Sequence, residues 1–99
     1  MFGLSSDVRL TDVGSRDGMV RGEFGGYRWE ARLTRGPVSY GLDPASLYKG
    51  YGQVARLVLH QRIGGSQSYR KVAAFDHGWL FGRKEHLAAI RRVVHYLVG

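Results

Sequence analysis

The sequence predicts an α+β fold in which an antiparallel β-meander of about four to five strands packs against one C-terminal α-helix. Two segments of alternating hydrophobicity each contain a Gly-Gly pair, Gly25-Gly26 and Gly64-Gly65, which is typical of a hairpin turn with positive φ angles. A later segment has apolar residues at helical spacing. Because 99 residues leave room for one hydrophobic core, residues 19–99 are expected to form a single domain.

Residues 1–18 carry the weakest pattern. Apolar and polar side chains alternate only weakly over residues 7–13, and residues 14–18 have the composition of a turn or linker. This segment is predicted to be either an N-terminal arm or an edge strand.

The first hairpin is expected over residues 19–34. A two-residue turn at Gly25-Gly26 fixes the register and gives three core-facing pairs: Phe24 with Tyr27, Gly22 with Trp29, and Val20 with Ala31. The other side pairs residues of opposite charge: Glu23 with Arg28, and Arg21 with Glu30. Because these charges cancel, this side of the sheet is not expected to bind nucleic acid.

Residues 36–52 are expected to form a long connection that contains a short helix. Asp43 can cap the exposed amides, Pro44 suits the first helical position, and Gly50 suits a left-handed stop. The helix would cover residues 45–49, which is roughly one and a half turns.

A second hairpin is expected from residues 54–61 and 68–75, followed by a short strand at Trp79–Phe81. One of its faces is apolar and carries Ala55, Leu57, Leu59, Val72 and Ala74. The other face is mixed and carries Val54, Val58, Tyr69, Ala73, Phe75, Arg56, His60 and Lys71. The pattern leaves open which face meets the core.

The C-terminal helix is expected over residues 83–98. Leu87, Ile90, Val94 and Leu97 form its apolar stripe. The opposite side carries the cations Lys84, Arg91 and Arg92 together with His95. The helix is therefore expected to cover one face of the antiparallel sheet.

Positive charge is concentrated in the second half of the chain. The whole chain has 15 Lys and Arg against eight Asp and Glu, for a net charge of +7. Residues 1–50 contribute seven basic and six acidic side chains (7 − 6 = +1), and residues 51–99 contribute eight and two (8 − 2 = +6). Such an excess favours an anionic partner such as nucleic acid.

Two groups of residues are the predicted binding site. The first is the basic helix face, formed by Arg83, Lys84, Arg91 and Arg92, to which Arg70 or Arg62 could be added. A surface helix also needs a polar face, and cations near its C-terminus suit the helix dipole, so a purely structural role stays open. The second group lies in the long connection, where Tyr48, Lys49 and Tyr51 either contact a partner or fold back as a lid over the core.

Several function classes are not expected. With no cysteine there is neither a disulfide framework nor a thiolate site, and the four histidines lack a metal-ligand spacing. No nucleophile and base occur at a recognisable spacing, so we expect no enzyme, no metal and no cofactor. No apolar run reaches the roughly 18 residues of a membrane span, and residues 1–7 lack the pattern of a secretion signal. We therefore expect a soluble, intracellular protein.

Four blocks of the chain resemble a known sequence pattern. They are G-Y-R-W at 26–29 with A-R at 31–32, S-Y-G-L-D at 39–43, G-Q-V-A-R-L at 52–57, and F-D-H-G-W at 75–79. Their order is similar to that of an uncharacterised family of short phage and prophage proteins with the blocks G-Y-R-F, Y-G-I-[DN], G-R-[IV]-x-K-L and Y-D-R-G-W. The similarity covers residues 20–97. It implies an α+β meander in a phage or mobile-element setting, without a defined reaction.

The chain departs from this pattern at several places. Residues 44–51 are inserted where the family passes almost directly to the glycine of the next block, and residues 1–18 are additional. His77 replaces the usual arginine, and Arg56 stands where lysine is common. Because the insertion contains Tyr48 and Tyr51, a function of this segment need not be shared with the family.

The resulting hypothesis is a non-enzymatic phage or prophage binding protein. Its anionic partner would be nucleic acid, or a host or defence nucleoprotein complex such as a CRISPR effector. The alternative is a virion or assembly component, or a homo-oligomeric interaction module. In that case an exposed sheet face with Val54, Val58 and Phe75 would form the protein interface.

Overall fold

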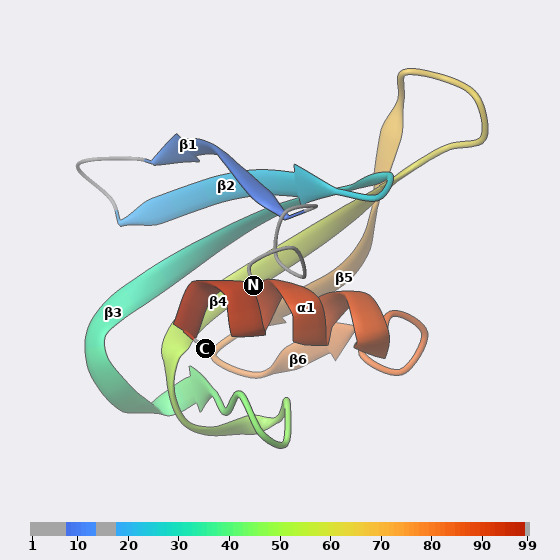
Figure 1. The fold of residues 1–99 in the computed structure, drawn as a ribbon. Coiled ribbons are helices and arrows are strands. Elements are labelled where there is room, and N and C mark those ends of the chain that lie inside the picture. The colour runs from blue at the N-terminus through green and yellow to red at the C-terminus, as the bar shows by residue number, and fades with distance from the viewer. Residues whose placement is uncertain (1–7, 14–17, 99) are drawn as a thin grey trace.

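The computed structural model, which describes residues 8–13 and 18–98, contains one antiparallel sheet and one helix (Figure 1). Within this part of the chain the sheet has six strands in sequence order, and α1 lies across one of its faces. The elements are β1 (Arg9–Val13), β2 (Met19–Phe24), β3 (Tyr27–Leu42), β4 (Lys49–Arg62), β5 (Tyr69–Asp76), β6 (Trp79–Phe81) and α1 (Leu87–Val98). The α+β prediction is confirmed, and the meander has more strands than predicted because residues 9–13 pair with β2.

The first hairpin has the predicted register. Gly22 lies opposite Trp29, and the turn glycines Gly25 and Gly26 have φ angles of 49° and 83°. A Cβ atom on Gly22 would lie 2.3 Å from Cζ2 of Trp29. The absent side chain at Gly22 therefore provides the space in which the Trp29 ring lies.

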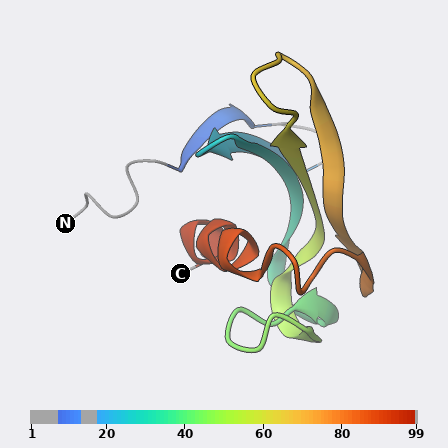
Figure 2. The same cartoon turned by 90° about the vertical axis from the view of Figure 1, so that its right-hand side faces the viewer.

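The hydrophobic core lies between α1 and the face of the sheet that it covers. Figure 2 shows the sheet curving around the helix, with the β4–β5 hairpin extending beyond it. The largest buried side chains come from β3, β4, β5 and α1: Trp29, Leu57, Leu59, Phe75, Ile90, Val93 and Val94. The predicted helical stripe is thus confirmed at Ile90 and Val94, whereas Leu87 and Leu97 are partly buried at its ends.

The second hairpin differs from the expected register. The amide of Ile63 donates to the carbonyl oxygen of Ser68 (2.9 Å), so the turn spans residues 64–67, within the connection expected between residues 61 and 68. A register shift between Leu59 and His60 then changes the side to which β5 side chains point. As a result, Phe75 faces the core.

The prediction of an exposed apolar sheet face at Val54, Val58 and Phe75 is therefore wrong. All three side chains are buried, Val54 and Phe75 completely. The register shift in β5 accounts for Phe75, and a second shift, opposite Arg32 and Leu33 of β3, places Val54 in the core.

The long connection expected over residues 36–52 is mostly strand. β3 and β4 extend through it and approach closely, since a Cβ atom on Gly41 would lie 2.0 Å from the carbonyl oxygen of Gly52. The predicted short helix is reduced to a turn over residues 44–46. Asp43 caps this turn as predicted, accepting hydrogen bonds from the Ala45 amide (3.0 Å) and the Ser46 hydroxyl (2.9 Å).

Leu47 is the reason that this turn does not continue as a helix. Its φ angle is +60°, and its side chain is fully buried in the core. Gly50, the expected helix stop, instead lies in β4 opposite Gly41. The left-handed backbone conformation at Leu47 ends the turn and directs the leucine side chain into the core.

Helix α1 begins at Leu87, four residues later than expected. Residues 83–86 form turns that begin at Gly82, whose φ angle is +83°. Arg83 and Lys84 therefore precede the helix, and only Arg91 and Arg92 belong to its exposed side. No helix in the described residues is long and apolar enough to cross a membrane.

Candidate nucleic-acid interface

Arg83, one of the predicted binding cations, has a structural role. Its Nε donates to the carbonyl oxygen of Leu47 and its Nη2 to that of Ser46, both at 3.0 Å. Nε1 of Trp79 donates to the same Leu47 oxygen at 2.7 Å. The Arg83 guanidinium also lies 3.7 Å from the centre of the Tyr48 ring. Arg83 therefore fixes the turn before β4 against the segment that leads into α1.

The other predicted residues of the connection are exposed. Tyr48 is 55% and Tyr51 is 73% exposed, so neither forms a lid over the core. The residue of this connection that packs into the core is the neighbouring Leu47, whose side chain is fully buried. Lys49 and Lys84 are exposed as well. Tyr48, Arg83 and Lys84 line one shallow hollow of about 300 Å³, so the structure brings these three predicted residues together.

Arg91 and Arg92 belong to a different part of the surface. Both are exposed on α1, and the Arg92 guanidinium lies 5.6 Å from the centre of the Phe24 ring. Phe24 in turn stacks on Tyr27 beside the Gly25-Gly26 turn, with a ring separation of 5.5 Å. Arg92 is therefore next to the tip of the first hairpin rather than beside Tyr48.

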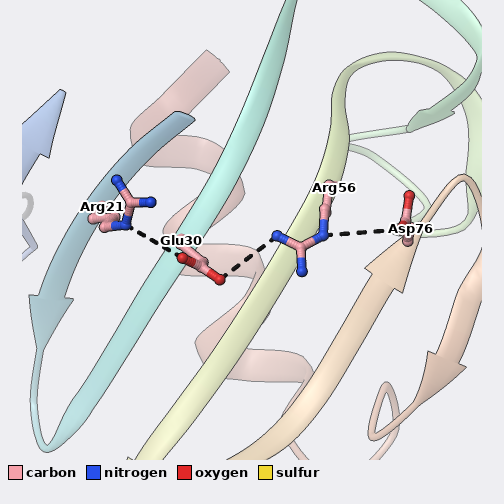
Figure 3. Close-up of polar contacts among 4 residues, drawn as sticks. All are labelled: Arg21, Glu30, Arg56 and Asp76. Carbon is pink, nitrogen blue, oxygen red and sulfur yellow. Dashed lines mark ion pairs between the residues drawn. The ribbon is translucent and has the colours of Figure 1, made fainter. Parts of the chain in front are cut away.

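The face of the sheet opposite α1, called here the outer face, carries a chain of ion pairs (Figure 3). Glu30 pairs with Arg21 of β2 (3.3 Å) and with Arg56 of β4 (3.6 Å), and Arg56 also pairs with Asp76 at the end of β5 (3.8 Å). Two cations and two anions thus alternate across four strands. The charges of these four residues cancel, and the pairing of Arg21 with Glu30 is the one predicted for the first hairpin.

Near the hairpin tips the outer face is basic. The Arg28 guanidinium lies 4.2 Å from the centre of the Tyr69 ring, and that of Arg62 lies 5.9 Å from it. Glu23, the cross-strand neighbour of Arg28, makes a 2.6 Å ion pair with Arg9 of β1. These five residues, Arg9, Glu23, Arg28, Arg62 and Tyr69, are called the tip cluster. Three cations surround one carboxylate in it.

Two hollows meet at the tip cluster. One, of about 500 Å³, extends over the outer face past Arg21, Glu30 and His60, and the other, of about 310 Å³, extends around Phe24 and the Gly25-Gly26 turn. Both are lined by Glu23 and Tyr69. Through Phe24 the second hollow reaches the ring on which Arg92 lies. The basic surface therefore continues from the outer face toward the exposed side of α1.

The titratable groups of this surface have shifted pKa values. The hydrogen bond from Arg9 lowers the pKa of Glu23, and the nearby charges of Arg9, Arg28 and Arg62 lower it further. Burial lowers the pKa of His60; the charge of Glu30 opposes this shift, and Lys71 adds a smaller lowering. At neutral pH, Glu23 is ionised and His60 carries no charge. Permanent cations therefore dominate the tip cluster.

The sequence interpretation missed Arg28 and Tyr69, and it considered Arg62 only as an addition to the basic helix face. It treated Arg28 as neutralised by Glu23, whereas the structure places Arg28 over Tyr69. A usable signal was present, because the sequence pattern already placed Tyr69, His60 and Lys71 on one face of the second hairpin. In the structure this face lies beside the first hairpin, since β3 and β4 pair along their length.

The described residues contain no group of three or more His, Asp and Glu side chains that could hold a metal ion. What the surface offers is a set of planar and cationic groups, which suits binding of an anion or a base. Comparison with family models, curated proteins and solved structures gave no match.

Proposed function

We propose that this chain is a non-enzymatic binding protein and that its partner is single-stranded nucleic acid, bound on the tip cluster and the adjoining exposed side of α1. The observation that supports this most directly is the stack of Arg28 on Tyr69, with Arg62 beside the same ring. Proteins that bind single strands combine cations along the backbone path with flat groups on which bases stack. Bases stack on arginine guanidinium planes as well as on aromatic rings.

The two hollows give such a strand a path. Phosphates would contact Arg62 near the hairpin turns, and bases would stack on Arg28 over Tyr69. Arg91 and Arg92 would extend the path onto α1. Each phosphate that these cations neutralise releases condensed counterions, so the affinity is expected to fall with salt.

Glu23 sets a condition on binding. Its carboxylate holds Arg9 in a 2.6 Å ion pair, so a phosphate at this position must compete with it. Like charges at close range oppose each other, and a strand is therefore expected to leave this pair intact and use Arg28 and Arg62 first. Removing the carboxylate would free Arg9 and strengthen binding.

The sequence resemblance adds a setting to the proposal. In a phage or prophage protein of the bacterial cytoplasm, a single-stranded partner would be the guide or target strand of a host or defence nucleoprotein complex. Binding there would make the chain an anti-defence factor. The basic surface supports such a role by its charge, and the resemblance supplies the biological context.

The proposal is tested by fluorescence anisotropy with labelled single-stranded RNA, single-stranded DNA and duplex DNA, between about 50 and 200 mM salt. The double variant Arg28→Ala/Arg62→Ala is expected to lose most of the single-strand affinity. The matched control is Arg32→Ala/Arg35→Ala, which removes the same charge from two exposed positions of β3 outside the tip cluster. Equal losses in both variants, or affinity for an acidic protein but for no oligonucleotide, would overturn the proposal.

A further inference from the structure

Strand β6 leaves one edge of the sheet open. It is the terminal strand and has three residues, against eight in β5. Its pairs with β5 are Ala74 with Phe81 and Phe75 with Trp79. In the described part of the chain, no strand pairs with the outer edge of β6. An unpaired strand edge offers backbone N–H and C=O groups to another extended chain.

Apolar side chains are exposed beside this edge. Leu80 is 66% and Phe81 is 47% exposed, and Tyr48 lies in the same hollow of about 300 Å³. A second hollow, of about 410 Å³, is lined by Arg70, Lys71 and Val72. Phe81 and Gly82 line both hollows, so the two adjoin. This combined area is called the edge surface.

The charge of the edge surface is positive. Arg70, Lys71, Arg83 and Lys84 line it, and the carboxylate of Glu85 is its single acidic group among the described residues. Arg83 is held by the Leu47 and Ser46 carbonyls, whereas Arg70, Lys71 and Lys84 are exposed. The edge surface is therefore complementary to a ligand that carries acidic side chains next to apolar ones.

We infer that the edge surface binds an extended acidic segment of a partner protein by strand addition. In this mode, backbone hydrogen bonds supply affinity and alternate side chains supply specificity. Apolar side chains of the segment would cover Leu80 and Phe81, and its carboxylates would reach Arg70, Lys71 and Lys84. This goes beyond the proposed function, because it uses a second surface and a different class of partner.

Two other occupants fit less well. A second copy of this chain also carries a net charge of +7, so two edge surfaces would place cations against cations. A nucleic acid would match the cations, but it cannot pair with the open backbone of β6, and the aliphatic Leu80 offers no flat stacking surface. An acidic peptide satisfies the backbone, the apolar groups and the charge together.

The test is the selection of a random peptide library for binding to the immobilised wild-type protein. Peptides that also bind the Leu80→Glu variant are removed by counter-selection. We expect enriched peptides that alternate acidic and apolar residues over about six positions. A synthetic peptide of the enriched sequence should bind Leu80→Glu and Lys84→Glu at least tenfold more weakly. The matched control is Leu10→Glu, which changes an exposed leucine on β1 at the opposite edge of the sheet.

Amide hydrogen exchange supplies the second measurement. Peptide binding should slow exchange in β6, whereas occupation of the apolar hollow alone would leave its outward amides exchanging freely. The inference is overturned if no peptide is enriched, if enriched peptides are basic, or if Leu10→Glu weakens binding as much as Leu80→Glu. It is also overturned if a labelled oligonucleotide competes at this edge, or if light scattering shows a dimer that Leu80→Glu dissociates. Because Arg28 and Arg62 are untouched, these outcomes are independent of those for the tip cluster.

Discussion

Trp79 donates a hydrogen bond of 2.7 Å from its indole Nε1 to the backbone carbonyl oxygen of Leu47, which lies 32 residues earlier in the chain. Leu47 has a φ angle of +60°, which is unfavourable for a leucine, and its side chain is fully buried. The hydrogen bond from Trp79 helps to stabilise this backbone conformation. Arg83 adds a second donor to the same oxygen at 3.0 Å. Two side chains, Trp79 of β6 and Arg83 of the segment after β6, thus fix the turn that precedes Tyr48.

Replacing Trp79 with phenylalanine keeps a ring next to Phe75 but removes the donor. We expect a loss of about 1 kcal/mol in the free energy of unfolding, measured by urea denaturation. Arg83→Ala is expected to cost more, because the Ser46 carbonyl loses its Arg83 donor, the Leu47 carbonyl keeps only the Trp79 donor, and Tyr48 loses the cation over its ring. Lys84→Ala, at the neighbouring exposed position, is the control and should change stability by less than about 0.5 kcal/mol. An equal effect of all three variants would contradict this role of the Leu47 carbonyl.

Gly22→Ala is expected to destabilise the fold, because the new Cβ atom would lie 2.3 Å from the Trp29 ring and 2.4 Å from the Arg9 carbonyl oxygen. Overpacking of this kind costs about 1–3 kcal/mol. For a domain of this size, each kcal/mol lowers Tm by about 4–8 °C in thermal unfolding followed by circular dichroism. The control is Gly65→Ala, where a Cβ atom would meet nothing within 4 Å. An unchanged Tm for Gly22→Ala would show that β1 moves away without cost.

Tyr69→Leu is expected to weaken single-strand binding while leaving the net charge unchanged. Loss of one stacking platform costs about 1–3 kcal/mol, or roughly 5- to 150-fold in Kd. The salt dependence should stay the same, because no phosphate contact is removed. Tyr51→Leu is the matched control, since Tyr51 is exposed in β4 away from the tip cluster. A change in salt slope without a change in affinity would argue against stacking at Tyr69.

Arg91→Glu/Arg92→Glu is expected to weaken binding of the anionic partner and to leave the fold intact, since both side chains are exposed on α1. If both cations contact phosphates of a single strand, the slope of log K against log salt falls by about 1.4. Anisotropy titrations at several salt concentrations give this slope, and circular dichroism checks the fold. Unchanged affinity would show that Arg91 and Arg92 of α1 do not contribute to the interface, which would then consist of the tip cluster alone.

Stability is expected to fall with acidification in two steps. Burial lowers the pKa of His60 below its ordinary value of 6.5, so the unfolded chain binds more protons than the folded one as the pH falls through this region. The stability that depends on neutral His60 is therefore complete above about pH 6.5 and is lost below it. Glu23, whose pKa is lowered from 4.5 mainly by Arg9, adds a second loss in more acidic solution.

Urea unfolding of the wild-type protein and of His60→Gln at about pH 7.5, about pH 5.5 and about pH 3.5 separates these steps. The variant should lose the part of the pH dependence that lies just below 6.5 and keep the more acidic part. The same slope in both proteins near pH 6 would show that His60 is not responsible.

The first hairpin was predictable because its signals are local and agree. Gly25-Gly26 allows a two-residue turn, and the same register puts Trp29 inward and pairs Arg21 with Glu30. The second hairpin lacks this agreement, since β4 is apolar on both sides at Leu57 and Val58. Its bulge could not be read from composition, because it depends on how β5 fits against its neighbours.

The candidate site was less predictable than the fold. The contact of Arg28 with Tyr69 joins β3 to β5 across β4, and it depends on the register that the sequence left open. Arg91 and Arg92 were identified correctly as surface residues, whereas for Tyr48 and Tyr51 the sequence left a surface position and a lid over the core open, and the structure shows the surface position. Arg83 looks like another surface cation in the sequence, because nothing nearby in the chain indicates that its partners are two carbonyls far away.

The order of the elements along the chain has a consequence for synthesis on the ribosome. Each strand of the sheet pairs with its neighbour in sequence, so the hairpins can form one after another as the chain emerges. α1 follows all six strands, and Trp29, Leu59 and Phe75 therefore stay uncovered until Ile90 and Val94 leave the exit tunnel. During that interval the nascent sheet exposes its whole apolar face. The protein is therefore expected to depend on chaperones until α1 packs against this face.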